Sequence, residues 1–104
     1  MLTEEKIAEL KNLHGPRLTA VDCEDGVLVF KPPSRANYDR FVDKKMSAPE
    51  TMSAHMRELA QSCLVMPNRD EMIALLDKYP ALLLNEIAEA VLDLAQSGGN
   101  VKKL

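Results

Sequence analysis

The segment around Asp25-Gly26 constrains the fold more than any other part of the sequence. β-Branched and aliphatic residues flank this dipeptide in LTAVDCEDGVLVFK, which spans residues 18–31. Asp and Gly both tolerate the positive φ angles of a tight turn, so the pattern predicts a two-stranded β-hairpin over about residues 18–31. Two strands alone are only marginally stable in water. One face of the hairpin must therefore pack on apolar side chains from the helices that follow.

Two adjacent prolines end the second strand of this hairpin. Neither residue of Pro32-Pro33 offers an amide hydrogen to a strand ladder, and Ser34 follows them as a helix N-cap. We expect Phe30, Tyr38 and Phe41 to pack where the hairpin meets that helix. The segment is therefore interpreted as a joint between the hairpin and a helical bundle.

The same segment has a second interpretation as an anion contact. Exposed backbone N–H groups at a helix N-terminus attract phosphates, and Lys31 and Arg35 stand on either side of Ser34. The joint is favoured, because a proline is needed here merely to end the strand. Arg35 is the one residue whose role the joint does not explain.

Helical periodicity and end signals predict five helices around the hairpin. The first is expected at about residues 3–13, because Thr3 precedes two glutamates and His14-Gly15-Pro16 ends the pattern. Four more are expected at about residues 34–46, 50–64, 69–78 and 81–97, followed by a flexible tail at 98–104. The sequence thus predicts a single α+β domain over residues 1–104, mostly α, with an N-terminal helix, one β-hairpin and a small bundle of about four helices.

The charge balance argues against nucleic acid as a partner. The 104 residues carry 13 basic and 16 acidic side chains, a formal net charge of −3, and no cluster of Lys and Arg. Neutralising phosphates requires such a cluster. No segment approaches the roughly 18 apolar residues of a membrane span. The first ten residues carry acids where a secretory signal is basic, so we expect a cytoplasmic protein without membrane contact.

The cysteines and histidines show no pattern of a reactive or metal-binding site. Cys23 and Cys63 lack the paired spacing of zinc or dithiol motifs, and neither His14 nor His55 has neighbours arranged as ligands. His55 and Cys63 fall two turns apart on one predicted helix, about 12 Å by helical rise, too far for a hydrogen-bonded dyad. We therefore expect no catalytic residue, no metal site and no cofactor.

The last predicted helix has more apolar residues than one stripe requires. Its main stripe consists of Leu84, Ile87, Ala88, Val91, Leu92 and Ala95. A second set lies off that stripe: Leu82, Leu83, Ala90 and Leu94. A one-domain protein cannot easily bury a helix on two sides. Either another helix of the same bundle covers the second set, or a partner chain does.

Methionines form another apolar group that a partner could use. Met52 and Met56 lie on a predicted amphipathic helix, and flexible thioethers suit surfaces that adapt to apolar peptides. The same flexibility lets methionine fill irregular cores, which is the favoured interpretation. Together with the second set of the last helix, these two residues are the candidate partner contacts.

Two stretches between about Leu28 and Gln96, roughly two-thirds of the chain, follow one another in order: VLVFKPPSRANYDRF, then RELAQSCLVMPNRDEMIALLDKYPALLLNEIAEAVLDLAQ. This order resembles that of the small tail assembly chaperones of tailed bacteriophages and prophages. The group has an apolar-Phe-(x)-x-Pro-(Ser/Thr)-Arg-x-x-(Tyr/Phe) junction, then a segment with Leu shortly before Cys-(Leu/Val)-Val-x-Pro-x-Arg, then a Leu-Leu-x-(Lys/Arg)-Tyr-Pro turn into a last helix. The positions that match here are Phe30, Pro33, Ser34, Arg35, Tyr38, Leu59, Cys63, Val65, Pro67, Arg69, Leu75, Leu76, Tyr79 and Pro80.

The resemblance implies a protein without enzymatic activity that acts during tail assembly. Its partners would be the tape measure protein and tail tube subunits, and the finished particle would not contain it. The alternative is a small bacterial adaptor or regulatory module that acts as a homodimer, or another homo-oligomer, through its last helix.

Overall fold

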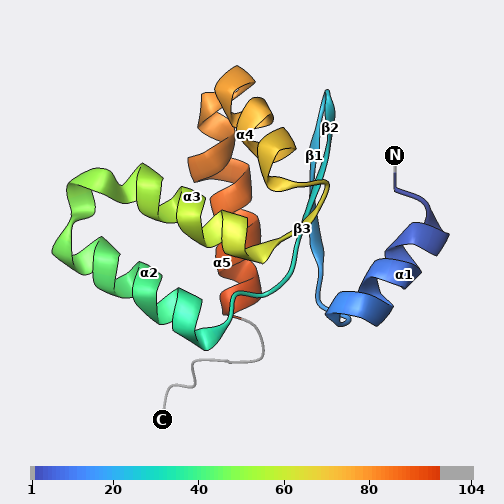
Figure 1. Cartoon of the computed structure of the whole chain (residues 1–104), viewed down its shortest axis with the longest axis horizontal. Helices are drawn as coiled ribbons and strands as arrows, with labels where there is room; N and C mark the ends of the chain where they lie inside the picture. The colour runs from blue at the N-terminus through green and yellow to red at the C-terminus, as the bar shows by residue number, and fades with distance from the viewer. Residues whose placement is uncertain (1, 97–104) are drawn as a thin grey trace, which may run out of the picture.

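The structure, a computed structural model, describes residues 2–96 and shows an α+β fold that is mostly α (Figure 1). The main elements in chain order are α1 (Glu4–His14), β1 (Thr19–Cys23), β2 (Gly26–Phe30), α2 (Arg35–Ser47), α3 (Met52–Cys63), β3 (Leu64–Met66), α4 (Arg69–Lys78) and α5 (Ala88–Ala95). Short 3₁₀ turns cover Pro49–Thr51 and Pro80–Leu82, and a π-helical segment covers Leu83–Ile87. The tail expected at 98–104 lies outside the described residues.

Side-chain caps begin the helices where the sequence predicts them. The hydroxyls of Thr3 and Ser34 accept from backbone N–H groups three residues later, at 3.1 Å and 3.2 Å. The Asn68 side chain accepts from the Glu71 N–H at 2.9 Å and so begins α4. Gly15 ends α1 with a φ of 96°, which a residue with a side chain rarely adopts.

The predicted hairpin is present, but its turn differs from the expected one. β1 and β2 pair antiparallel with Cys23 opposite Gly26, so Glu24 and Asp25 form the loop and Gly26 begins β2. Neither loop residue has a positive φ, and neither does Gly26. The turn therefore lies one residue earlier than predicted and does not use the glycine's conformational freedom.

A third strand extends the sheet, which the sequence analysis did not predict. β3 pairs antiparallel with β2, giving the order β1-β2-β3, and the Lys31 N–H donates to the Cys63 carbonyl at 2.9 Å. The predicted helix over residues 50–64 instead ends at Cys63. The chain becomes extended before Pro67, because proline disfavours helical conformation in the residue before it.

One apolar core joins the sheet to the helices that follow it. The buried residues from the sheet are Val21, Leu28 and Phe30, and those from α2, α3 and α4 are Phe41, Met56, Leu59, Ala60, Cys63, Met72 and Leu76. The last helical segments contribute Leu82, Leu83, Ile87, Ala90, Val91 and Leu94. Tyr38 packs beside Phe41 with ring centroids 6.4 Å apart, at the expected joint.

The orientation of the last helix corrects the sequence analysis. Its assigned main stripe includes Leu84, which is 51% exposed, and Ala95, which is also exposed. The second set, Leu82, Leu83, Ala90 and Leu94, is buried in the same core as Ile87 and Val91 of the main stripe. Apolar residues cover more than half of this helix's circumference, so periodicity alone does not decide which part faces the core. The bundle of the same chain covers the second set, which is therefore not available to a partner.

One further contact joins the segment before β1 to the last turn of α5. The Arg17 guanidinium donates to the carbonyl of Leu94, in the last turn of α5, where a cation complements the helix dipole.

None of the helices in residues 2–96 has both the length and the apolar character of a membrane-spanning segment.

The neighbours Leu83 and Leu84 give a test of this packing. Leu83→Ala should lower the free energy of unfolding by about 2–5 kcal/mol, because it leaves a cavity in the core. Leu84→Ala should change it by no more than about 0.5 kcal/mol, because that side chain is half exposed. Urea denaturation followed by circular dichroism measures both. Equal losses would show that the last helix is rotated relative to this structure.

Candidate functional site

The two faces of the sheet are both apolar, but the helical bundle covers only one. Leu28 on β2 packs into the core together with its cross-strand partner Val21. Ala20, Val27 and Val29 alternate with them and so project from the opposite face. In Figure 1 the sheet stands between α1 on one side and helices α2 to α5 on the other. The face opposite the bundle is therefore the one that α1 approaches.

A shift in strand register adds a methionine to this outer face. Leu64 of β3 pairs with Phe30 and packs against the core, whereas Met66 pairs with Val29. The register shifts between Val29 and Phe30, where one step along β2 corresponds to two steps along β3. Leu64 and Met66, which would share a face in a regular strand, therefore lie on opposite faces of the sheet. Met66 thus extends the apolar outer surface beyond β2.

α1 covers one end of this outer face. Leu10 is buried and lines a cavity of about 160 Å³ together with Ile7, Ala20 and Val29. Val29 is only 3% exposed although it lies outside the main core, so α1 accounts for its burial. The contact between α1 and the sheet is a small second apolar cluster.

A larger cavity lies between the sheet and α4. A cavity of about 470 Å³ lies there, with Val27 and Met66 along the sheet and Ala74 and Leu75 along α4. We call this larger cavity the outer groove; its apolar lining is Val27, Met66, Ala74 and Leu75.

A polar contact fixes the hairpin turn at the edge of the outer groove. The Asp25 carboxylate accepts from the Lys78 ammonium and, at 3.2 Å, from the Tyr79 hydroxyl. The hydrogen bond from Lys78 lowers the pKa of Asp25, and the same bond raises the pKa of Lys78. The turn is thereby attached to the end of α4, which forms one wall of the groove.

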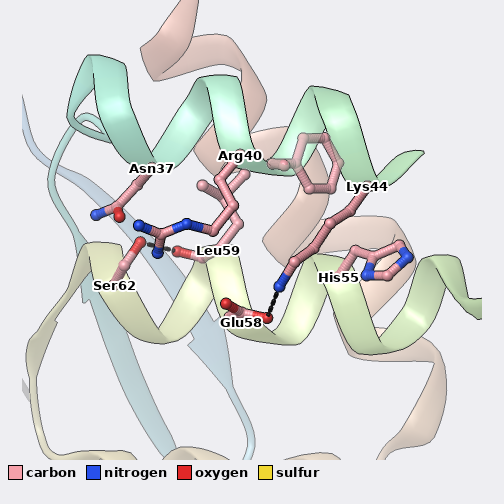
Figure 2. Close-up of a pocket in the computed structure, with 8 residues that line it drawn as sticks. Asn37, Arg40, Lys44, His55, Glu58, Leu59 and Ser62 are labelled. Atoms are coloured by element: carbon pink, nitrogen blue, oxygen red, sulfur yellow. Dashed lines mark hydrogen bonds and ion pairs between the residues drawn. The ribbon is translucent and has the colours of Figure 1, made fainter. Parts of the chain in front are cut away.

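A second, polar groove lies between α2 and α3 (Figure 2). Asn37, Arg40 and Lys44 reach across from α2 toward Glu58 and Ser62 on α3, around a cavity of about 50 Å³. Lys44 pairs with Glu58 at 2.8 Å and lowers the pKa of that carboxyl. The cavity has room for little more than a water molecule, so this groove ties two helices together and does not enclose a substrate.

His55 and the cysteines do not form a reactive set. His55 Nε2 lies 2.8 Å from the Thr51 hydroxyl and donates to the Ala48 carbonyl at 3.0 Å, at the turn before α3. Burial raises the pKa of the Cys63 thiol, and burial likewise raises that of Cys23. Thiols with raised pKa values stay protonated at neutral pH and are poor nucleophiles. Within residues 2–96, no three His, Cys, Asp or Glu side chains are placed to hold a metal ion.

The predicted partner contacts come together, but as core. Met56 is 2% exposed, and Met52 is half-buried against the same cluster as the second set of α5. The core thus takes up the six candidate residues, Leu82, Leu83, Ala90, Leu94, Met52 and Met56. The core interpretation of the methionines is the one that agrees with this packing.

The predicted anion contact is not assembled. The Ser34 hydroxyl is engaged as the cap of α2, while the Arg35 side chain is 95% exposed and lies 3.7 Å from Asp39 on its own helix. Lys31 uses its backbone N–H to extend the sheet. The segment is a joint, and Arg35 forms an exposed ion pair there.

The sequence analysis missed the outer groove, although β2 carried a signal for it. Val27, Leu28, Val29 and Phe30 form an unbroken apolar run, which is typical of a strand covered on both faces. A strand on the surface of a bundle alternates apolar and polar residues instead. The remaining groove residues come from β3 and α4 and show no common pattern in the sequence.

Comparisons with known proteins identify the family. Residues 17–102 match the family described as Domain of unknown function (DUF6848), and the chain belongs to it. No curated protein matches the chain. A solved structure of the uncharacterised protein rbstp2171 from Bacillus stearothermophilus is similar, with a TM-score of 0.66 and 24% identity. That match covers 92% of this chain and 98% of the other, and it supports the fold alone.

The ion pair at the hairpin turn predicts a pH dependence. The Asp25 pKa is lowered in the folded state, so the ion pair stabilises that state at pH values above the usual carboxyl pKa. This contribution is lost as pH falls through the lowered folded-state pKa. Asp25→Asn should therefore lower the urea midpoint slightly at neutral pH, and the difference from wild type should shrink as pH falls below the usual carboxyl range and vanish below the folded-state pKa of Asp25. The control is Asp77→Asn, which removes an exposed carboxylate from α4 next to Lys78. A difference for Asp25→Asn that persists at low pH would assign its effect to the turn backbone.

Proposed function

We propose that this protein is a tail assembly chaperone of a tailed phage or prophage, and that it holds apolar stripes of the tape measure protein in the host cytoplasm before the tail tube forms. The observation that carries this proposal is the outer groove. It combines an aliphatic floor on the sheet with a wall on α4 and is open to solvent at the Val27 and Met66 end.

The groove has the form that an amphipathic client helix requires. A helix that lies on a sheet buries one aliphatic stripe and keeps its charged side in water, which is a common mode of peptide recognition. Val27 and Met66 give the groove an apolar lining on the side of the sheet, and Ala74 and Leu75 give it one on the side of α4. A long tape measure helix with exposed apolar stripes would aggregate without such a cover, and tail tube subunits are further clients of the same kind.

The resemblance to tail assembly chaperones supports the same assignment. The matching residues are structural in this fold: Phe30 and Cys63 lie in the core, and Ser34 caps α2. Tyr79 hydrogen-bonds to the hairpin turn, next to Pro80, where the chain turns toward α5. These residues maintain the sheet and the helices between which the outer groove forms.

Co-expression with a tape measure protein from the same genome tests the proposal. The wild-type chain should move the tape measure protein from the insoluble to the soluble fraction and remain bound to it through purification. Ala74→Glu places a carboxylate in the wall of the outer groove and should weaken binding at least about tenfold, because burying that charge is unfavourable. Ala54→Glu, at an exposed position of α3, is the matched control.

The outcomes separate this function from the alternative adaptor. A tape measure protein that stays insoluble in the presence of the chain would overturn the proposal. A stable homodimer indifferent to the tape measure protein, measured by sedimentation equilibrium, would favour the adaptor. Equal loss of binding in Ala74→Glu and Ala54→Glu would remove the outer groove as the binding surface.

A further inference from the structure

We propose that the open edge of β1 is a second binding surface, on which an extended segment of a basic partner protein pairs as an additional strand. This surface shares no lining residue with the outer groove, so the inference goes beyond the proposed function and does not rest on it. The partner is defined by its chemistry: a segment in extended conformation that carries several Lys or Arg residues.

The register of the hairpin leaves backbone groups of β1 without a partner. Cys23 and Gly26 close a two-residue loop, so they exchange backbone hydrogen bonds, and alternation along the ladder gives the same bonds to Val21. The N–H and C=O groups of Ala20 and Asp22 therefore point away from β2. Within residues 2–96, β1 has no strand neighbour on that side, because the sheet order is β1-β2-β3. An extended segment placed along this edge can hydrogen-bond to all of these groups.

A groove runs along this edge and has the last helical segments as its other wall. Its volume is about 290 Å³, and its lining consists of residues 19–22 of β1 together with Glu86, Glu89, Ala90 and Asp93. Ala20 and Asp22, whose backbone groups lack a strand partner, are both exposed. The edge is therefore accessible from solvent, and α5 forms a wall beside it.

The groove is acidic. Its lining includes four exposed carboxylates: Asp22, Glu86, Glu89 and Asp93. No Lys or Arg of the described chain lines it, and none of these carboxylates forms an ion pair within residues 2–96. The neighbouring Cys23 thiol responds to the same charges, because burial raises its pKa and Asp22 and Glu86 raise that pKa further. Lys or Arg side chains of a paired strand would complement these carboxylates.

The same charges argue against a second copy of this chain as the occupant. Two β1 edges paired with each other would bring two acidic walls together, and like charges at an interface are unfavourable. Charges on an edge strand often serve only to prevent such pairing. Here Glu89 and Asp93 stand on α5, across the groove from the strand, so they also offer a surface to cations. A basic extended segment matches both the backbone edge and the charges.

The available edge is short. The Arg17 guanidinium donates to the Leu94 carbonyl and so ties the chain just before β1 to α5, which leaves residues 20–22 for pairing. Pairing over so few residues provides few backbone hydrogen bonds. The charges must therefore supply much of the affinity, and added salt should weaken binding.

A synthetic peptide tests this surface on the full chain. The probe is a peptide of about ten residues with alternating Lys and Thr, blocked at both ends, because Thr favours extended backbone. Glu86→Gln combined with Glu89→Gln should weaken its binding about tenfold in fluorescence anisotropy at low ionic strength. Asp43→Asn combined with Glu50→Gln removes the same charge from exposed positions that do not line the groove. This control should leave the affinity within about twofold.

Hydrogen exchange measured by NMR reports strand pairing directly. The amides of Ala20 and Asp22 should exchange at least about tenfold more slowly when the peptide is bound, because they gain acceptors. A second peptide with two adjacent central amides N-methylated keeps its charge but lacks hydrogen-bond donors on both of its edges. It should bind at least about fivefold more weakly than the first.

Several results would overturn the proposal. Equal affinities of the two peptides, or unchanged exchange at Ala20 and Asp22, would show that only charge attracts the peptide. An equal loss of binding in the two pairs of variants would remove the groove as its site. A gain of at least about fivefold for Lys102→Glu combined with Lys103→Glu would assign the edge to basic residues of the same chain instead of a partner.

The two surfaces can be tested separately. Ala74→Glu in the outer groove should leave the affinity for the Lys-Thr peptide within about twofold, whereas Glu86→Gln with Glu89→Gln should not change the solubility of the tape measure protein. Failure of the peptide to bind the wild-type chain would overturn the edge as a binding surface and leave the proposed function to its own test.

Discussion

The structure depends on a central strand that is apolar on both faces. Leu28 and Phe30 of β2 are completely buried in the main core, while Val29 is buried on the opposite side. β1 and β3 pair with β2 from either edge, and the bundle packs only on the side of Leu28 and Phe30. The other face would be unfavourable to expose entirely, and this accounts for the packing of α1, whose Leu10 lines a cavity with Val29.

The elements with local signals were predictable from the sequence. The caps at Thr3, Ser34 and Asn68 each use a side chain and a backbone N–H three residues apart, so the sequence contains the whole interaction. The hairpin was recognised from its two apolar segments. Its turn was placed one residue late, because both members of Asp25-Gly26 suit a turn and the register that chooses between them is set by the opposing strands.

The elements that depend on distant pairing were not predictable in the same way. β3 consists of three apolar residues at the end of an amphipathic helix, and only its contact with Val29 and Phe30 makes it a strand. The orientation of α5 was ambiguous because its apolar surface is wider than the core contact. The outer groove brings together residues from β2, β3 and α4, so it exists only once those elements are assembled. Sequence patterns describe each element's own faces and not which faces meet.

The contact between Arg17 and Leu94 has a consequence for the exposed edge of the sheet. β1 is an edge strand, and a loosened edge strand can pair with another molecule and start aggregation. Arg17 fixes the start of β1 to the last turn of α5, 77 residues away along the chain. The start of this edge strand therefore cannot separate from the bundle without breaking its contact with α5, which limits its exposure to other molecules.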